Sequence, residues 1–210
     1  MTEKESYIYG LLITDGSIYL TTRNRGKVVL EISKRDEDIV DKLINEIPNS
    51  TKRERTRSTN FSKEYSSVSF NNHRLEFRTW LFECGYPKED KTNNASIPSV
   101  DFSETDFWRG VIDGDGSLGI TSKNIPFVSL VTKSESLKNE YLDFIEKKLG
   151  IVKRINRNKR DKVYNICVTR DSATKLAKLL YEDCNGFCLK RKYSKFLEII
   201  ENDTIRGKNM

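Results

Sequence analysis

Residues 8–17 read Ile8-Tyr9-Gly10-Leu11-Leu12-Ile13-Thr14-Asp15-Gly16-Ser17, and a related stretch begins 100 residues later. The second stretch reads Trp108-Arg109-Gly110-Val111-Ile112-Asp113-Gly114-Asp115-Gly116-Ser117. Both have a glycine inside an apolar segment, and both end in Asp-Gly-Ser. A repeat of about half the 210-residue chain predicts two copies of one domain, because about 100 residues is a common domain size.

The charge balance of the chain points toward a polyanionic partner. There are 37 Lys and Arg residues against 31 Asp and Glu residues, which gives a formal net charge of +6. This balance favours nucleic acid as the partner. Composition alone is also compatible with a basic protein that has no special partner.

The four cysteines are too sparse for the disulfide framework of a secreted domain. Cys184 and Cys188 could indicate a metal site, but the only histidine, His73, is distant in sequence. We therefore interpret the cysteines as buried free thiols. The N-terminus has no signal-peptide pattern and no apolar run reaches membrane-spanning length. We expect an intracellular protein, in the cytoplasm or an organelle matrix, with no membrane contact.

Each repeated stretch is predicted to end a helix. Thr2-Glu3-Lys4-Glu5 has the pattern of a capping box, and Ser103-Glu104-Thr105-Asp106 offers a similar start. The two helices are expected to stop at Gly16 and Gly116. Gly10 and Gly110 cost helix propensity, so their matching positions indicate close contact of two helix backbones between the halves. A small residue beneath a bulky neighbour is the alternative explanation.

Alternating apolar and polar residues predict strands after each motif, with Ile18, Leu20, Leu118 and Ile120 covering the helices. Further hairpins are expected at 52–57 with 65–70 and at 152–157 with 162–169. Helices are expected at 36–47, 72–84, 134–149, 172–184 and 190–200. The predicted fold class is α+β, with two pseudo-symmetric αββαββα halves. The predicted domains are a first half at 1–86, a linker at 87–101, a second half at 102–203 and a flexible tail at 204–210.

Asp15 and Asp115 are predicted to lie at helix C-termini, where the helix dipole disfavours an anion. If Gly10 and Gly110 bring the helices together, the two carboxylates also repel each other. A divalent cation would remove both problems. Hard oxygen ligands without nearby His or Cys suit Mg²⁺, with Mn²⁺ or Ca²⁺ able to occupy the same sites. The simpler interpretation is that Asp-Gly is a turn signal after each helix.

The two motifs resemble those of the LAGLIDADG homing endonucleases, in the single-chain form that has two motifs. Residues 110–116 match closely and residues 10–16 match more loosely, and the repeated element order extends the resemblance over nearly the whole chain. The resemblance implies that the last acid of each motif, Asp15 or Asp115, binds metal. The earlier acidic position holds Asp113 in the second motif but Ile13 in the first, which suggests that the two helix ends are supported differently.

The resemblance also implies a curved antiparallel sheet in each half, together forming a saddle laid in the DNA major groove. The outward positions of the alternating pattern supply candidate DNA contacts. In the first half these are Tyr19, Thr21, Arg23, Arg53, Arg55, Arg57, Ser67 and Ser69. In the second half they are Thr121, Lys123, Lys153, Arg157, Lys159 and Arg160. A solvated strand face is the alternative for each of them.

The family places basic or polar residues around its metal sites. By motif position, Lys91 and Lys190 resemble one such pair, with Lys88 and Lys192 as the neighbouring alternatives. Lys34 and Lys133, at the ends of predicted strands, resemble a second pair. These lysines could stabilise charge on the phosphate or orient the attacking water. A lysine at a solvated helix start or turn is the alternative.

These observations predict a monomeric, Mg²⁺-dependent, site-specific endonuclease acting on a long double-stranded DNA target. The resemblance implies cuts across the minor groove with short 3′ overhangs, in the service of a mobile intron. Two other functions stay open at this point. One is an RNA-splicing maturase, and the other is a DNA-binding regulator that kept the fold without cleaving.

Overall fold

The computed structural model describes residues 1–59 and 62–208. The first half contains α1 (Glu3–Asp15), β1 (Gly16–Leu20), β2 (Gly26–Ser33), the 3-10 helix η1 (Lys34–Asp36), α2 (Glu37–Glu46), β3 (Ser50–Thr59), β4 (Ser62–Asn72) and α3 (Leu75–Glu83). A short helix, α4 (Lys91–Asn94), lies in the predicted linker. The second half contains α5 (Glu104–Asp115), β5 (Gly116–Ile120), β6 (Pro126–Thr132), α6 (Glu135–Leu149), β7 (Tyr164–Thr169), α7 (Asp171–Tyr181) and α8 (Lys190–Lys208).

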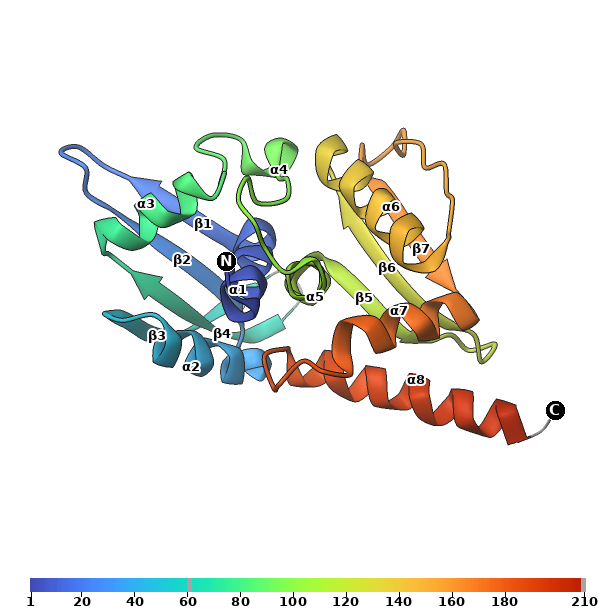
Figure 1. The fold of residues 1–210 in the computed structure, drawn as a ribbon. Helices are drawn as coiled ribbons and strands as arrows, with labels where there is room; N and C mark the ends of the chain where they lie inside the picture. The colour runs from blue at the N-terminus through green and yellow to red at the C-terminus, as the bar shows by residue number, and fades with distance from the viewer. Residues whose placement is uncertain (60–61, 209–210) are drawn as a thin grey trace.

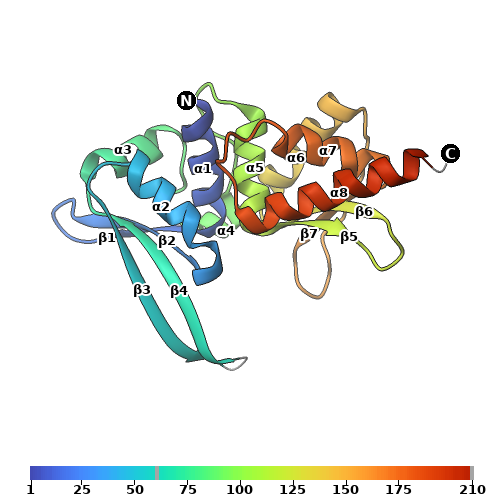
Figure 2. The same ribbon diagram turned by 90° about the horizontal axis from the view of Figure 1, so that it is seen from below.

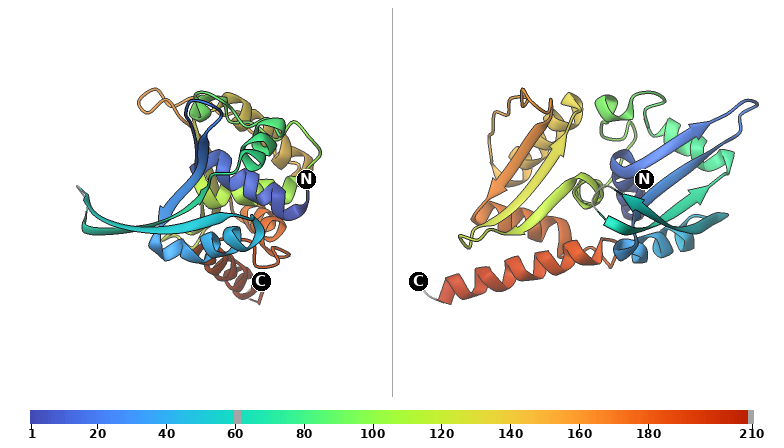
Figure 3. Two further views of the ribbon diagram at one scale, coloured as in Figure 1. Left: turned by 90° about the vertical axis from the view of Figure 1, so that its left-hand side faces the viewer. Right: turned by 180° about the vertical axis from the view of Figure 1, so that it is seen from behind.

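Each half has one antiparallel sheet with helices on one side. The strand order is β1-β2-β4-β3 in the first half and β5-β6-β7 in the second. The two sheets lie on either side of the central helices α1 and α5, and the first sheet is visibly curved (Figures 1 and 3). Seen from below, the helices form one layer and the β3–β4 hairpin projects away from it (Figure 2). The predicted class, two halves each with a curved antiparallel sheet, is confirmed.

Helices α1 and α5 pack with their backbones in direct contact at the two inner glycines. A methyl group at position 10 would lie 2.2 Å from the carbonyl oxygen of Phe107, and one at 110 would lie 2.3 Å from that of Tyr7. The predicted helix contact between the halves is therefore confirmed. Thr2 and Glu5 form the predicted capping box at the start of α1. The hydroxyl of Ser103 instead donates a hydrogen bond to the carboxylate of Asp106.

Both motif helices end where the sequence predicts, but for a different local reason. Gly16 and Gly116 are extended, with φ of −74° and −92°, and do not adopt the left-handed conformation of many C-terminal glycines. A side chain at position 16 would collide with the carbonyl oxygen of Leu12 at 2.5 Å. Each glycine thus allows the chain to turn from the helix directly into a strand.

The second half departs from the predicted element order, because β7 has no hairpin partner among the described residues. Residues 152–157 are not part of the sheet; a turn joins the backbone of Asn158 to that of Val163, and Val152 is 72% exposed. The prediction of a strand there was wrong: Ile151 and Ile155 pack against the core, but the segment forms no ladder with β7. The segment between α6 and β7 projects from the same side of the molecule as the β3–β4 hairpin (Figure 2).

Two smaller predictions also fail. The tail predicted from residue 204 continues as helix to Lys208, as part of α8. Leu20 is 56% exposed and does not cover the helices, whereas Leu118 is 5% exposed. Leu20 ends β1, in a hairpin that extends to the edge of the molecule (Figure 1). No helix in the described ranges has the length and apolar character needed to cross a membrane.

Candidate functional site

Asp15 and Asp115 end helices α1 and α5, side by side at the junction of the two halves. Gly114 makes this approach possible. A methyl group at position 114 would lie 2.0 Å from Oγ1 of Thr14 and 3.2 Å from Oδ2 of Asp15. The end of one motif helix therefore lies directly against the end of the other, and the two acids predicted from the sequence are brought together.

Asp15 and Asp115 are both exposed residues, but the protein around their carboxyl groups partly desolvates them. This partial desolvation is the main cause that raises the pKa of both. The pKa of Asp115 is raised to about 6, with the charge of Asp15 as the second cause. Lys91 and Lys192 act in the opposite direction on both acids. Protein lysines thus only partly offset the repulsion and desolvation.

Two lysines brace the motif helix ends in matching ways. Nζ of Lys91 donates hydrogen bonds to the carbonyl oxygens of Gly16, at 2.6 Å, and Thr14. Nζ of Lys192 donates to those of Ile112, at 2.7 Å, and Gly116. Burial lowers the pKa of Lys91, and it lowers the pKa of Lys192 to about 8. Both ammonium groups therefore lie at the helix ends beside the acids.

The prediction of Lys190 as the partner of Lys91 was wrong, and its neighbouring alternative, Lys192, occupies the position. Lys190 is exposed and lines a separate cavity of about 420 Å³ together with Cys184 and Cys188. Those two thiols are buried and free, with their Sγ atoms 3.2 Å apart. Residues 190–192 are all basic, so only the rotational setting of α8 decides which of them faces the acids.

Of the second predicted lysine pair, Lys133 and Lys34, only one lies near the acids. Lys133 lines a cavity of about 190 Å³ together with Asp115 and Lys91, so it does lie near the acids. Lys34 does not: its Nζ lies 2.7 Å from Glu37 and 2.5 Å from Glu54, which holds it against α2 and β3. Glu37 is a local partner three residues after Lys34, whereas Glu54 lies 20 residues away on β3 and was not visible as a partner from the sequence.

Two buried carboxylates that the site prediction omitted hold the start of α8 in place. Asp36 is 4% exposed and accepts from Nε of Arg191 at 2.9 Å, which joins the first half to α8. Asp113 is fully buried and accepts from the hydroxyls of Tyr7 and Tyr181, both at 2.7 Å. It also accepts from the backbone N–H of Leu189, the residue before α8, at 2.8 Å. The Ile13 and Asp113 asymmetry was the only sequence signal for this network.

The donor set at the helix ends fits a hard divalent cation. Asp15 and Asp115 offer carboxylate oxygens, and desolvation together with the charge of Asp15 raises the pKa of Asp115. Among residues 1–59 and 62–208, no group of three or more His, Cys, Asp and Glu side chains could hold a metal ion. The rest of a coordination shell would therefore come from water and phosphate oxygens, as Mg²⁺ commonly prefers.

The outward face of the first sheet carries most of the contacts predicted for the first half. Tyr19 is 54% exposed on β1, while Arg53, Arg55 and Arg57 line the outer strand β3. Ser69 shares this face, but Ser67 is only 1% exposed and its hydroxyl donates to Glu31 at 2.7 Å. Ser67 therefore supports Glu31 and is not itself open to a ligand.

The remaining predicted contacts lie in turns and loops. Thr21 and Arg23 are exposed in the β1–β2 turn, and Thr121 and Lys123 are exposed in the β5–β6 turn. Four others lie in the irregular segment between α6 and β7; of these Lys153 is half-buried, and the exposed ones are Arg157, Lys159 and Arg160. The guanidinium of Arg160 pairs with Asp161 at 2.9 Å.

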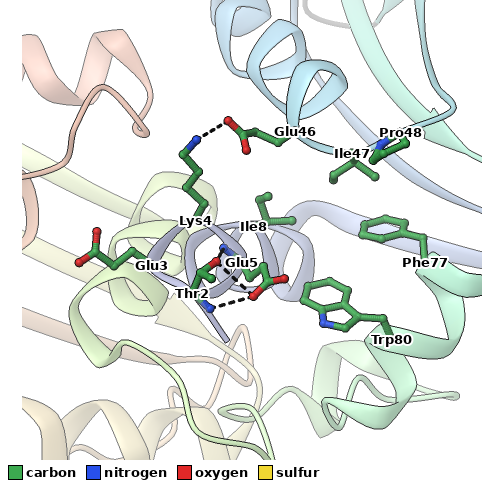
Figure 4. A pocket seen from close by; sticks show the side chains of 10 residues that line it. All are labelled: Thr2, Glu3, Lys4, Glu5, Ile8, Glu46, Ile47, Pro48, Phe77 and Trp80. Atoms are coloured by element: carbon green, nitrogen blue, oxygen red, sulfur yellow. Dashed lines mark hydrogen bonds and ion pairs between the residues drawn. The ribbon is translucent and has the colours of Figure 1, made fainter.

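A cavity of about 690 Å³ lies at the opposite end of α1, where Ile8, Phe77 and Trp80 form apolar walls (Figure 4). Its rim contains the ion pair of Lys4 with Glu46. A 13-residue helix is about 20 Å long, so this cavity is remote from the acids at the other end of α1.

The sequence of this chain was compared with protein-family models and with curated proteins. Residues 103–181 match the family model of the LAGLIDADG-like domain. The matched stretch runs from the residue before α5 to the end of α7, so the likeness to this family model covers most of the second half. A sequence search of curated proteins found no match.

The LAGLIDADG fold extends over both halves. The homing endonuclease I-WcaI, solved bound to its DNA recognition sequence, is 13% identical, with a TM-score of 0.65 over 92% of this chain and 85% of that one. The LAGLIDADG meganuclease I-CpaMI, bound to uncleaved DNA, is 11% identical, with a TM-score of 0.66 over 97% and 92%. Full-length DUF199/WhiA from Thermatoga maritima is 12% identical, with a TM-score of 0.52 over 96% and 60%. At these identities the matches establish a shared fold.

Proposed function

We propose that this chain is a site-specific DNA endonuclease that hydrolyses one phosphodiester in each strand of a long double-stranded target. The observation that carries the proposal is the pair of acids, Asp15 and Asp115, meeting at the junction of two halves with one braced lysine beside each. A basic chain with two curved sheets, and the likeness to homing endonucleases solved on DNA, support the same conclusion.

In this proposal Asp15 and Asp115 hold Mg²⁺, and Mn²⁺ or Ca²⁺ could occupy the same position. When bound, the cation supplies Lewis-acid stabilisation of charge on phosphate oxygens and activation of water. The carboxylates orient it between the halves, where the two strands of a duplex can be reached together. Their mutual repulsion favours the ion over an empty pair of acids.

Lys91 and Lys192 have positioning and electrostatic roles. An ammonium group has three N–H donors, and each lysine uses two of them on the carbonyl oxygens of its motif helix. The remaining N–H of each is available to a phosphate oxygen or to the attacking water. Lys133, on the wall of the same cavity, adds positive charge there. Lys34 has no role, because Glu37 and Glu54 already hold it.

The finer features of the proposal follow from the family resemblance and the symmetry of the chain. One chain supplies both acids, so the active form is a monomer. Cleavage across the minor groove leaves short 3′ overhangs, and the biological result is mobility of a host intron. A non-cleaving DNA-binding regulator with this fold is the rival, and an RNA-splicing maturase is a second one.

The deciding experiment incubates the purified protein with a duplex that spans the insertion site of its own gene, with Mg²⁺ or with EDTA. We expect a double-strand cut with Mg²⁺ only, and no cut by the Asp115→Asn variant. Tight binding without a cut in either condition would favour the regulator. Correct splicing of the host intron RNA in place of DNA cleavage would favour the maturase.

A further inference from the structure

The outward faces of the two sheets differ in chemistry. In the first sheet, the outward positions are mostly charged or polar, with Tyr19 and Val29 on the same face: Lys27, Glu31, Arg53, Arg55, Arg57 and Ser69. In the second sheet, the matching positions are Ser117, Gly119, Phe127, Ser129, Val131, Asn165, Cys167 and Thr169. The described second face therefore contains no charged side chain, whereas the first carries several basic side chains and the acidic Glu31.

Glu31 makes the first face suited to base edges. Its carboxylate accepts from Ser67 at 2.7 Å and lies 3.6 Å from the guanidinium of Arg57. A carboxylate would be repelled by phosphates, but it can accept a hydrogen bond from the N4 amino group of cytosine. Arg53 and Arg55, exposed on the adjacent strand β3, have the fork geometry that binds guanine O6 and N7. Carboxylate and guanidinium together match a G·C pair.

The second face presents apolar groups that do not belong to the core. Val131 is 39% exposed, and the ring of Phe127 lies across Gly119, 3.6 Å from where a methyl group there would be. Exposed apolar side chains in the major groove contact the C5-methyl group of thymine. Asn165, which is exposed and opposite Val131, has the amide that pairs with adenine N6 and N7. This face matches A·T pairs.

Positive charge in the second half lies at the margin of the sheet. The segment between α6 and β7 carries Lys153, Arg154, Arg157, Lys159 and Arg160 outside the sheet. Basic groups on an irregular segment supply phosphate contacts, which fix position and add affinity but do not read sequence. In the second half, the basic segment between α6 and β7 would therefore supply affinity for DNA. The uncharged face of the sheet would supply the discrimination between bases.

We propose that the two halves read chemically different half-sites: G·C pairs beneath β2, β4 and β3, and A·T pairs beneath β5, β6 and β7. This inference rests on the proposed function, because it assumes that these faces meet DNA. It adds the composition of the target and names the discriminating residues, Glu31, Arg55, Val131 and Asn165.

The test begins with selection of bound duplexes from a randomised double-stranded library by the full chain. We expect one half of the selected site to be rich in G·C and the other rich in A·T. Deoxyuridine then replaces thymidine in one half-site at a time, which removes only the methyl groups. The protein should bind about 10-fold more weakly when deoxyuridine is placed in the A·T-rich half-site. The same replacement in the other half-site should change binding little. 7-Deazaguanine in the G·C-rich half, which removes the N7 acceptor, should weaken binding similarly.

Protein variants assign each half-site to its sheet. Val131→Ala should bind thymidine and deoxyuridine duplexes alike, and Arg55→Ala should lose sensitivity to 7-deazaguanine. Val152→Ala, also exposed but outside the sheet, is the control and should keep both sensitivities. All three positions are exposed, and circular dichroism will confirm that the variants fold. A selected site without this division would overturn the inference alone, whereas selection of no site would overturn the proposed function with it.

Discussion

Lys91 and Lys192 occupy equivalent positions in the two halves, each with its ammonium group on the carbonyl oxygen of the glycine that ends a motif helix. They reach these positions from corresponding places in the chain, because α4 follows α3 and α8 follows α7. Lys91 starts the short helix α4 between the halves, and Lys192 lies in the first turn of α8. The pseudo-symmetry of the acids thus extends to the lysines that lie beside them.

Substitution of Lys192 should separate the two candidate lysines of α8. We expect Lys192→Met to reduce the cleavage rate by about 100-fold or more, because it removes a positioned cation from beside the acids. Lys190→Met, which changes an exposed residue two positions away, should cleave at nearly the original rate. Single-turnover cleavage with saturating protein measures both. Equal losses in the two variants would contradict the assignment.

Cleavage should depend on pH through Asp115. Its pKa is raised to about 6, and the cation requires the deprotonated carboxylate. At limiting Mg²⁺ the rate should therefore fall as pH decreases through about 6. Because Mg²⁺ and protons compete, a higher Mg²⁺ concentration should move this midpoint to lower pH. A midpoint that does not move with Mg²⁺ would show that another group limits the rate.

The same acid should lower stability at neutral pH. A folded-state pKa above the unfolded value of 3.8 means that the folded protein binds the Asp115 proton more tightly. The resulting stabilisation is fully present below about pH 4 and is lost as pH rises through about 6. Asp115→Asn should therefore raise the melting temperature at pH 7.5 in EDTA, and this gain should shrink at pH 5. A lower melting temperature at pH 7.5 would contradict the sign.

The contact of α1 with α5 should not tolerate a side chain at Gly110. A methyl group there meets the backbone oxygen of Tyr7 at 2.3 Å, so the helices would have to separate. We expect Gly110→Ala to lower the free energy of unfolding by about 3 kcal/mol. Gly150→Ala is the control: its φ is +67° but no atom lies within 4 Å, so it should cost only about 1 kcal/mol. Chemical denaturation compares the two, and equal losses would contradict the packing argument.

Asp113 should be needed for stability even though Ile13 replaces it in the first motif. Asp113→Ile would leave the hydroxyls of Tyr7 and Tyr181 and the N–H of Leu189 buried without their acceptor. We expect a loss of about 3 kcal/mol or more in the free energy of unfolding. Tyr7→Phe, which removes one donor and leaves the acceptor with two others, should cost about 1 kcal/mol. A stable Asp113→Ile protein would show that the network is dispensable.

Several features of the fold could be predicted from local sequence patterns. The matching positions of Gly10 and Gly110 predicted that the two motif helices touch. Because Asp15 and Asp115 are the last residues of these helices, the same contact predicted that the two acids lie close together. Both inferences needed only helical periodicity and a repeat, which are properties of consecutive residues. The segment at 152–157 has a similar local pattern but forms no strand, because burial of its apolar residues depends on neighbours distant in the chain.

The sequence by itself determined the duplication, the two motif helices and the acids at their ends, since each is encoded in adjacent residues. Only the tertiary structure decided that Lys192 and not Lys190 braces the second helix end, and that Glu54 on β3 pairs with Lys34. The setting of α8 depends on Asp36 and Asp113, whose partners lie 76 to 155 residues away. Charged groups that are distant in sequence come together only when whole helices and strands pack. The periodicity of a local sequence does not determine that packing.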